Sequence, residues 1–252
     1  MRALANSVGV EIRPGVFRPD WSAVITAAAQ DALLARFASR ERLIDKWSIP
    51  LDEMADRLWQ CVLRLFADLG RGPGIDELSA AVGWPPRRVR DALRELEHRD
   101  LLGLDGATST VLHAYPFAEH PTGHTVLLGT RVLNALCAVD ALGVGAMFQK
   151  DVAAMSRCRA CGTDICIATM NRGRSLRSVS PADVVVWYDL GFAGCAATSC
   201  CPKIAFFCSA AHLQAWRDGA GSGEDGRRLL PAEALEVGRA LFGPVLAEAA
   251  SV

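Results

Sequence analysis

Nine cysteines are the side chains of this 252-residue chain with the greatest capacity for chemistry. They occupy positions 61, 137, 158, 161, 166, 195, 200, 201 and 208, so eight of them follow residue 136. Their odd number argues against complete pairing in disulfides, and clustered thiols in a reducing compartment indicate soft-metal or redox chemistry. We therefore expect the chemistry of this protein in its C-terminal half.

One of these thiols is accompanied by a carboxylate. Cys137 and Asp140 lie in the segment 131–148, whose apolar residues predict a helix. Positions i and i+3 share one face of a helix, so the two groups should project into the same space. A carboxylate among apolar neighbours needs a partner, and the nearby thiol supplies one.

Cys200 and Cys201 are adjacent and precede the apolar segment 204–207, which predicts a strand. Neighbouring side chains on an extended chain point in opposite directions, so we expect one of the two thiols to face the same pocket as Cys137. Free cysteine otherwise behaves as a small buried apolar residue. That plain interpretation is applied to three isolated cysteines: Cys61, Cys195 and Cys208.

Cys158 and Cys161 have the Cys-x-x-Cys spacing that supplies half of a structural zinc site. The sequence contains no second Cys-x-x-Cys, and Cys200 and Cys201 are poor substitutes because neighbouring thiols diverge. A structural zinc held by Cys158 and Cys161 is therefore an open prediction.

Periodicity and helix breakers predict the elements that position these groups. Apolar residues at helical spacing predict helices from Trp21 to about Asp45 and from Met54 to Leu69, and the Gly-Arg-Gly-Pro-Gly segment at 70–74 ends the second. Two short helices and a ribbon over 101–112 complete a winged helix-turn-helix.

Beyond residue 113, turn-rich stretches separate short strands, expected at 124–129, 164–169, 184–189 and 203–208. Ser209 should cap a helix that runs through Trp216, a loop is expected at 219–227, and a last helix begins near Ala232. The fold class is therefore α+β. Its expected parts are an N-terminal extension with a helix at 1–50, a winged-helix-like domain at 51–113 and a catalytic domain at 114–252; residues 1–20 should run over the surface.

Bulk composition excludes several classes of function. With 27 basic and 28 acidic side chains the formal net charge is −1, which gives no general attraction to nucleic acid or to an anionic membrane. No segment has the length and apolarity of a membrane span, and no signal peptide is recognisable, so a cytoplasmic protein is expected. Gly-rich phosphate loops, Ser-His-Asp arrangements and His-rich protease motifs are also absent from the sequence.

Residues 76–216 resemble the organomercurial lyase (alkylmercury lyase) family. The segments that carry the resemblance are Leu78-Ser-Ala-Ala-Val-Gly-Trp-Pro-Pro-Arg-Arg-Val89, Ala135-Leu-Cys-Ala-Val-Asp-Ala-Leu142 and Ser199-Cys-Cys-Pro-Lys-Ile-Ala-Phe-Phe207, in family order and at family-like separations. The resemblance implies a winged-helix-like domain packed on a C-terminal mixed β-sheet domain with flanking helices.

The resemblance also implies roles for individual residues. Cys137 and Cys200 match the two catalytic cysteines that ligate mercury, and Asp140 matches the catalytic aspartate and is also a candidate mercury ligand. Cys201 matches a non-essential neighbour and is an additional candidate ligand, whereas Cys158 matches a cysteine regarded as structural. This chain departs from the family pattern at three positions: Leu136 and Ser199 replace aromatic residues, and Ala196 replaces a basic residue.

The implied reaction is protonolysis of a carbon–mercury bond, which yields a hydrocarbon and bound Hg(II). Mercury arrives with the organomercurial substrate, so no cofactor is required, and small cytosolic thiols or a mercury-binding partner would remove the product. Thiolate is the ligand type that soft metals prefer.

Two other functions remain open. One is a lyase-like protein that binds copper, zinc or mercury without cleaving carbon–mercury bonds. The other is a winged-helix transcriptional regulator that senses metals or thiols, with four arginines available for phosphates: Arg87, Arg88, Arg90 and Arg94. Acidic residues on the same helix, Asp91, Glu95 and Glu97, argue against nucleic-acid binding.

Overall fold

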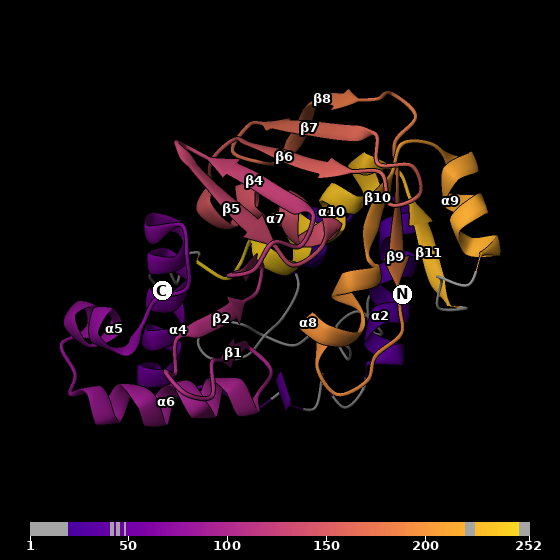
Figure 1. The fold of residues 1–252 in the computed structure, drawn as a ribbon. Helices are drawn as coiled ribbons and strands as arrows, with labels where there is room; N and C mark the ends of the chain where they lie inside the picture. The colour runs from indigo at the N-terminus through magenta and orange to yellow at the C-terminus, as the bar shows by residue number, and fades with distance from the viewer. Residues whose placement is uncertain (1–19, 41–42, 44–45, 48, 220–224, 247–252) are drawn as a thin grey trace.

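The computed structural model describes residues 20–40, 43, 46–47, 49–219 and 225–246, and the structural statements below concern these residues. They form an α+β fold with an eight-stranded sheet in the order β1-β2-β3-β5-β4-β6-β7-β8 and a three-stranded sheet in the order β10-β9-β11 (Figure 1). The surface path predicted for residues 1–20 falls outside the described residues, except for Asp20.

The N-terminal part begins with a short 3₁₀ helix, η1 (Trp21–Ala23), followed by α2 (Ala27–Ser39). Thr26 starts α2 because its Oγ1 accepts a hydrogen bond from the Ala29 amide at 3.4 Å. The single helix predicted from Trp21 is therefore wrong at its start, since this N-cap separates two helical segments.

Three further helices match the sequence prediction closely. These are α4 (Glu53–Leu69), α5 (Ile75–Val82) and α6 (Pro86–His98), and they precede the antiparallel pair β1 (Leu102–Leu104) and β2 (Val111–Ala114). Asp52 caps α4, because its Oδ1 accepts from the Ala55 amide at 2.7 Å, and Gly70 ends the helix at φ 76°. The classification of this unit as a winged helix stays a prediction.

The remaining strands build both sheets. They are β3 (Phe117–Ala118), β4 (His124–Leu128), β5 (Arg131–Ala135), β6 (Val152–Arg157), β7 (Asp164–Met170), β8 (Ser175–Ser180), β9 (Val185–Asp189), β10 (Ala205–Phe207) and β11 (Gly226–Leu229). Every strand pairing among the described residues is antiparallel. The predicted mixed sheet is therefore wrong, and short connections such as those from β4 to β5 and from β6 to β7 explain why: a parallel pair requires a long crossover. β11 also occupies part of the loop predicted at 219–227.

The helix predicted over 131–148 contains a strand at its start. β5 forms a hairpin with β4, in which Leu128 pairs with Arg131 and Gly129 takes φ 62° in the two-residue turn. The helix α7 spans only Ala138–Phe148, and Cys137 is its N-cap residue. The sequence prediction failed here because a short strand and the helix after it form one continuous apolar stretch.

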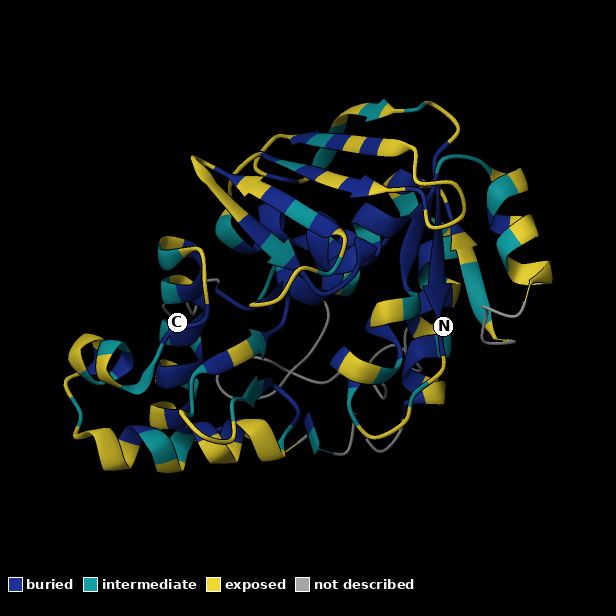
Figure 2. Cartoon of the chain, in the orientation of Figure 1, coloured by how far each residue is buried: buried dark blue, intermediate teal, exposed yellow. Residues whose placement is uncertain are grey.

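The eight-stranded sheet covers α7 on one face. Residues of β4, β6 and β7 alternate between buried and more exposed positions, as expected for strands with one face on the core. α7 is buried along almost its whole length, between this sheet and α10 (Pro231–Phe242) (Figure 2). The predicted last helix and the helix α9 (Ala210–Asp218), capped by Ser209, are confirmed.

Glycines let α7 and α10 approach at backbone distance. A Cβ built on Gly238 would lie 2.9 Å from both the Gly143 nitrogen and the Val139 carbonyl oxygen, and a Cβ on Gly143 would lie 2.9 Å from the Gly238 oxygen. These are backbone atoms, which cannot rotate away as a flexible side chain would. The close contact fixes the position of α7, whose first turn carries Cys137 and Asp140.

We predict that Gly238→Ala lowers the free energy of unfolding by about 1–3 kcal/mol, because the added methyl overpacks the α7–α10 contact. Alanine is otherwise favoured over glycine inside helices by about 1 kcal/mol, so a neutral or stabilising effect would contradict the backbone contact. Urea denaturation measures the change. Gly106→Ala is the control, since a Cβ at Gly106 meets no atom within 4 Å.

Candidate active site

The first catalytic candidates lie where β5 ends and α7 begins. Cys137 is extended at φ −153° and ψ 177°, and its Sγ accepts a hydrogen bond from the Asp140 amide at 3.3 Å. The thiol and the carboxyl therefore face the same space, as predicted, although Cys137 caps the helix instead of lying within it. The Ala138 amide donates to the Ile204 carbonyl at 3.1 Å and ties this junction to the segment after Cys201.

The second cysteine pair does not lie on extended chain, contrary to the sequence prediction. Cys200 ends the one-turn helix α8 (Ala196–Ser199), and Cys201 begins the 3₁₀ helix η2 (Cys201–Lys203). The two thiols do not diverge as predicted, because they are in hydrogen-bonded contact with each other. Only Cys201 joins Cys137 and Asp140, in a group whose ligand atoms all lie within 4.8 Å of one another. The Cys200 thiol instead donates to the Ala196 carbonyl at 3.4 Å.

Two residues that flank the β1–β2 pair, one before β1 and one after β2, hold the start of α8. The Ala196 amide donates to Asp100 Oδ2 at 3.0 Å, and the Ala197 amide donates to the Tyr115 hydroxyl at 2.9 Å. These bonds satisfy two amides that a helix N-terminus leaves without partners. They also fix the approach of the chain to Cys201.

Cys137, Asp140 and Cys201 line a narrow cavity of about 30 Å³. Two arginines also line it: Arg36 from α2 and Arg40, which follows the end of that helix. The rest of the lining is largely apolar or aromatic and includes Trp59, Leu101, Tyr115, Tyr188, Ala196 and Phe242. A cavity of this size has room for about one or two water molecules, so the groups face a nearly dry interior.

Several polar atoms around this cavity lack hydrogen-bond partners among the described residues. Arg40 Nη2 donates to the Asp189 carbonyl at 2.8 Å, but Arg40 Nε, Arg36 Nε, Arg36 Nη1 and Asp140 Oδ2 have no partner there. Buried polar groups normally form hydrogen bonds, and a buried group without one costs about 1–3 kcal/mol of stability. Their convergence on one cavity indicates a site that is completed by a ligand.

Burial determines the protonation of these groups. It raises the pKa of Asp140 from 3.8 to about 7, against the opposing effects of contact with Cys137 and of the positive charges on Arg36 and Arg40. Burial also raises the pKa of Cys137. The pKa of Cys201 is raised as well, chiefly by its hydrogen-bonded contact with Cys137, so both thiols are protonated at neutral pH in the absence of a ligand.

The sequence analysis missed Arg36 and Arg40. Both side chains are buried, with 6% and 2% of their surface exposed. Their spacing could have indicated a shared site, because two arginines four positions apart on an alanine-rich helix lie on one face. Arg36 also lies over the Trp47 ring, with 5.3 Å between the guanidinium carbon and the ring centroid.

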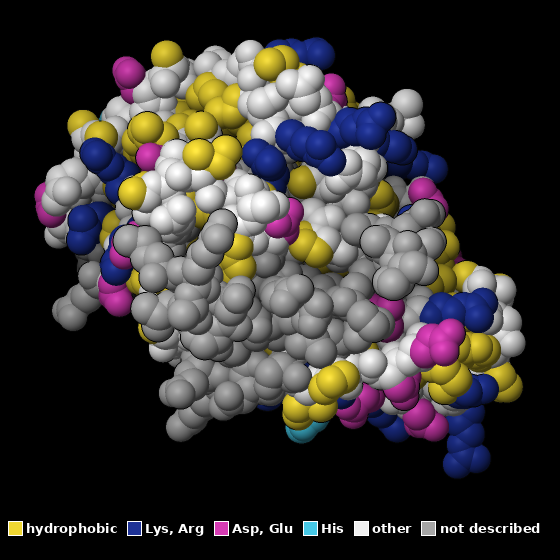
Figure 3. Space-filling model, turned by 180° about the vertical axis from the view of Figure 1, so that it is seen from behind, with side chains coloured by type: hydrophobic (Ala, Val, Ile, Leu, Met, Phe, Trp, Pro, Cys, Tyr) yellow, Lys and Arg dark blue, Asp and Glu magenta, His cyan; other side chains and the backbone are white. Residues whose placement is uncertain are grey.

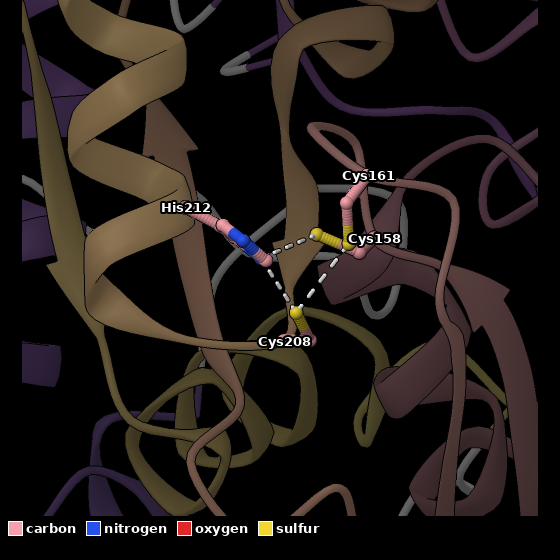
Figure 4. A group of neighbouring side chains, drawn as sticks. All are labelled: Cys158, Cys161, Cys208 and His212. Atoms are coloured by element: carbon pink, nitrogen blue, oxygen red, sulfur yellow. Dashed lines mark hydrogen bonds between the residues drawn. The ribbon is translucent and has the colours of Figure 1, made fainter.

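A second group of metal-ligand side chains gathers outside this cavity. Cys158 and Cys161, predicted as half of a zinc site, meet Cys208 and His212, and all four ligand atoms lie within 4.8 Å of one another (Figure 4). Cys208, for which an ordinary apolar environment was predicted, is half-buried and packs against the hydrophobic core, and its thiol also lies within this group. Cys195 and Cys61 are both half-buried, and Cys195 lies close to Asp100 and His113.

The arginines of α6 do not form a basic face. Arg94 lies 3.9 Å from Asp91, and Arg88 lies over the Trp84 ring. Seen from behind, the corner that carries α5 and α6 shows basic and acidic side chains next to one another (Figure 3). This arrangement gives no support to the DNA-binding alternative. No helix among the described residues has the length and apolarity needed to cross a membrane.

Comparisons with known proteins show the family and the fold of this chain. The family model described as alkylmercury lyase (MerB) matches residues 117–243, about half of the chain. Among solved structures, the mercury-bound form of MerB2 has a similar fold, with a TM-score of 0.67 and 21% sequence identity; the match covers 84% of this chain and 98% of that one. No curated protein matches the chain.

We predict that Asp140→Asn makes the protein increasingly more stable than the parent as pH rises from about 4 to about 7. The folded protein binds the Asp140 proton more tightly than the unfolded chain, whose pKa is near 3.8, so the parent loses stability across this window. At about 1.4 kcal/mol per pKa unit the difference reaches at most about 4 kcal/mol.

Urea denaturation at several pH values measures this difference. Asp105→Asn is the control, because hydrogen bonds from Thr108 hold the pKa of Asp105 below its usual value and its effect stays constant over the same window. A stability difference between Asp140→Asn and the parent that does not change with pH would contradict the raised pKa.

Proposed function

Because the chain belongs to the alkylmercury lyase family, we propose that it cleaves the carbon–mercury bond of organomercurials by protonolysis, with Cys137, Cys201 and Asp140 as the reacting groups. One observation carries this assignment: two thiols and a carboxyl converge in a buried cavity, where Asp140 Oδ2 and guanidinium nitrogens of Arg36 and Arg40 lack hydrogen-bond partners among the described residues. The proposal places Cys201 in the role that the sequence resemblance implies for Cys200.

The thiols supply the affinity for the substrate. Mercury is soft and prefers thiolate to oxygen or nitrogen ligands. Although burial keeps both thiols protonated beforehand, a coordinated metal deprotonates a thiol outright. The mercury of R–Hg⁺ therefore binds first to one thiolate and then to the other. Two thiolates on mercury increase its electron density and weaken its bond to carbon.

Asp140 moves the proton between sulfur and carbon. It accepts a proton from one of the thiols as the thiolate forms, and it then delivers this proton to the departing carbon. The overall change is R–Hg⁺ plus two thiols giving R–H, a dithiolate-bound Hg(II) and one released proton. A carboxyl with a pKa of about 7 can both accept and donate near neutral pH.

Arg36 and Arg40 balance the negative charge that develops in the cavity. Their positive charges lower the pKa of Asp140 against the effect of burial, and the charge of Arg40 also interacts favourably with thiolates at Cys137 and Cys201. Ala196, which stands where the family pattern has a basic side chain, lines the same cavity. We propose that the arginines of the α2 region supply the positive charge that Ala196 lacks.

Small thiols or a mercury-binding partner complete the cycle in this proposal. Both cysteines are almost fully buried, with 1% of Cys137 and 6% of Cys201 exposed. Bound Hg(II) must therefore transfer to an incoming thiol that enters the cavity. Hg(II) is a product here, and the reaction needs no other cofactor.

We predict that the purified protein, given an organomercurial and excess small thiol, releases the protonated hydrocarbon, which gas chromatography detects. Cys137→Ser and Cys201→Ser should lose turnover because each removes a mercury ligand. Asp140→Asn should lower kcat by about 10²–10⁴-fold, the usual contribution of a positioned proton donor. Cys200→Ser is the matched control and should turn over like the parent, because Cys200 lies outside the cavity lining.

Other outcomes would change the assignment. Loss of turnover in Cys200→Ser with activity retained in Cys201→Ser would return the catalytic role to Cys200. Mercury bound without any hydrocarbon product would instead favour the soft-metal-binding alternative over a lyase.

We predict that Arg40→Met shifts the pH profile of kcat/KM toward higher pH by about one unit. The charge of Arg40 lowers the pKa of Asp140, and a buried opposite charge lowers a carboxyl pKa by roughly one to three units. Arg40 acts as a positioning residue through Asp140 and the thiols, so a merely structural role would lower kcat/KM equally at every pH. Arg228→Met, at an exposed position on β11, is the control. A profile that coincides with that of the parent would contradict this role.

A further inference from the structure

Four side chains with metal-binding atoms meet at the surface, away from the active-site cavity. Cys158 and Cys161 come from the loop between β6 and β7, Cys208 follows β10, and His212 lies in the first turn of α9 (Figure 4). Cys158 is buried, Cys161 is exposed, and Cys208 and His212 are half-buried. None of the four lines the cavity of Cys137 and Asp140.

The loop that carries two of the cysteines is tightly folded. The Gly162 amide donates to the Cys158 carbonyl at 2.9 Å, and the Cys158 amide donates to the Thr163 carbonyl at 2.8 Å. Gly162 takes φ 75°, which glycine adopts without strain. These bonds bring both thiols of the Cys-x-x-Cys segment to the same side of the turn.

The other two groups are positioned by the start of α9. Ser209 caps this helix, because its Oγ accepts from the His212 amide at 3.2 Å. The cap places His212 one turn into the helix and turns its ring toward Cys208, with 2.8 Å between the Cys208 Sγ and Nδ1. The resulting Cys-x-x-x-His segment supplies the second half-site that the sequence alone did not show.

The distances fit a tetrahedral ion. With zinc–sulfur bonds of about 2.3 Å, two sulfur ligands of a tetrahedron lie about 3.8 Å apart. The Cys161 and Cys208 sulfurs are 3.7 Å apart, and the Cys158 sulfur is 3.9 Å from His212 Nδ1. The Cys208 sulfur lies 2.8 Å from His212 Nδ1, closer than the roughly 3.5 Å between a sulfur and a nitrogen ligand of tetrahedral zinc, so this pair must separate when the ion binds while the other two separations change little.

We propose that Cys158, Cys161, Cys208 and His212 form a structural Zn(II) site, separate from the site of carbon–mercury cleavage. Three thiolates and one imidazole are a ligand set of closed, tetrahedral structural zinc sites. All four protein ligands are present, so no position is left open for a substrate. Zinc also suits this mixture of sulfur and nitrogen donors better than the harder ions that prefer oxygen.

The site joins the two sheets. Its first two ligands belong to the turn between β6 and β7 of the eight-stranded sheet, and Cys208 directly follows β10 of the three-stranded sheet. The Arg159 amide already donates to the Phe206 carbonyl at 3.1 Å across this junction. Since β10 lies between Cys201 and Cys208, zinc would also anchor the strand that follows the second mercury ligand, a consequence that rests on the proposed function.

Elemental analysis tests the proposal on the whole chain. Protein loaded with Zn(II) and dialysed should retain about one zinc per chain. Cys161→Ser and His212→Ala should weaken zinc binding by more than about 100-fold in a chelator competition, since even loss of an outer-shell partner costs about 10–100-fold. Cys166→Ser, an exposed cysteine on β7 outside the group, should retain zinc like the parent.

Cobalt(II) provides a second readout that needs no variant. The parent loaded with Co(II) should show the intense d–d absorption of a tetrahedral ion and thiolate-to-cobalt charge transfer. The weak spectrum of octahedral cobalt would overturn the proposal, as would a parent that retains no zinc or that retains iron or copper instead.

The lyase centre is tested separately. Zinc retained in Cys137→Ser combined with Cys201→Ser supports the proposal, whereas its loss there would place the ion at the active site and overturn it. Because zinc content is measured without substrate, this result does not depend on whether the chain cleaves organomercurials.

Discussion

Asp140 is a carboxyl group buried in the core of the protein, and its burial determines which side chains must surround it. Removal from water raises the pKa of this carboxyl group from 3.8 to about 7, so it can both hold and donate a proton close to neutral pH. Neighbouring side chains must offset the free-energy cost of removing this carboxyl group from water. Two thiols, two guanidinium groups and a helix held by backbone contact with α10 surround the carboxyl, and each limits where the others can lie.

The helical part of the fold could be predicted from the sequence because capping residues and glycines mark where its helices begin and end. Asp52 and Ser209 cap helices, and the glycine after α4 ends one. The hairpin from β4 to β5 was missed because β5 and α7 read as one apolar stretch. The strands β6, β8 and β11 were also missed, since half-exposed antiparallel strands have weak patterns that only their partners stabilise.

The site was predicted in part for the same reason. Cys137 and Asp140 are close in sequence, so helical spacing was enough to pair them. The sequence did not show which of Cys200 and Cys201 lies near Cys137 and Asp140. The two cysteines lie in helical turns, whereas the apolar segment after them predicted extended chain. Arg36, Cys208 and His212 come from segments far along the chain from their partners, and tertiary packing alone brings them together.

The cavity that contains Asp140 extends beyond the region that matches the family model. The family model begins at residue 117, yet Arg36 and Arg40 enter the cavity from α2 and its end, and Asp100 and Tyr115 hold the start of α8. The surroundings of Asp140 are therefore completed by residues outside the matched region. A fragment that began at residue 117 would lack both guanidinium groups whose charges lower the pKa of Asp140.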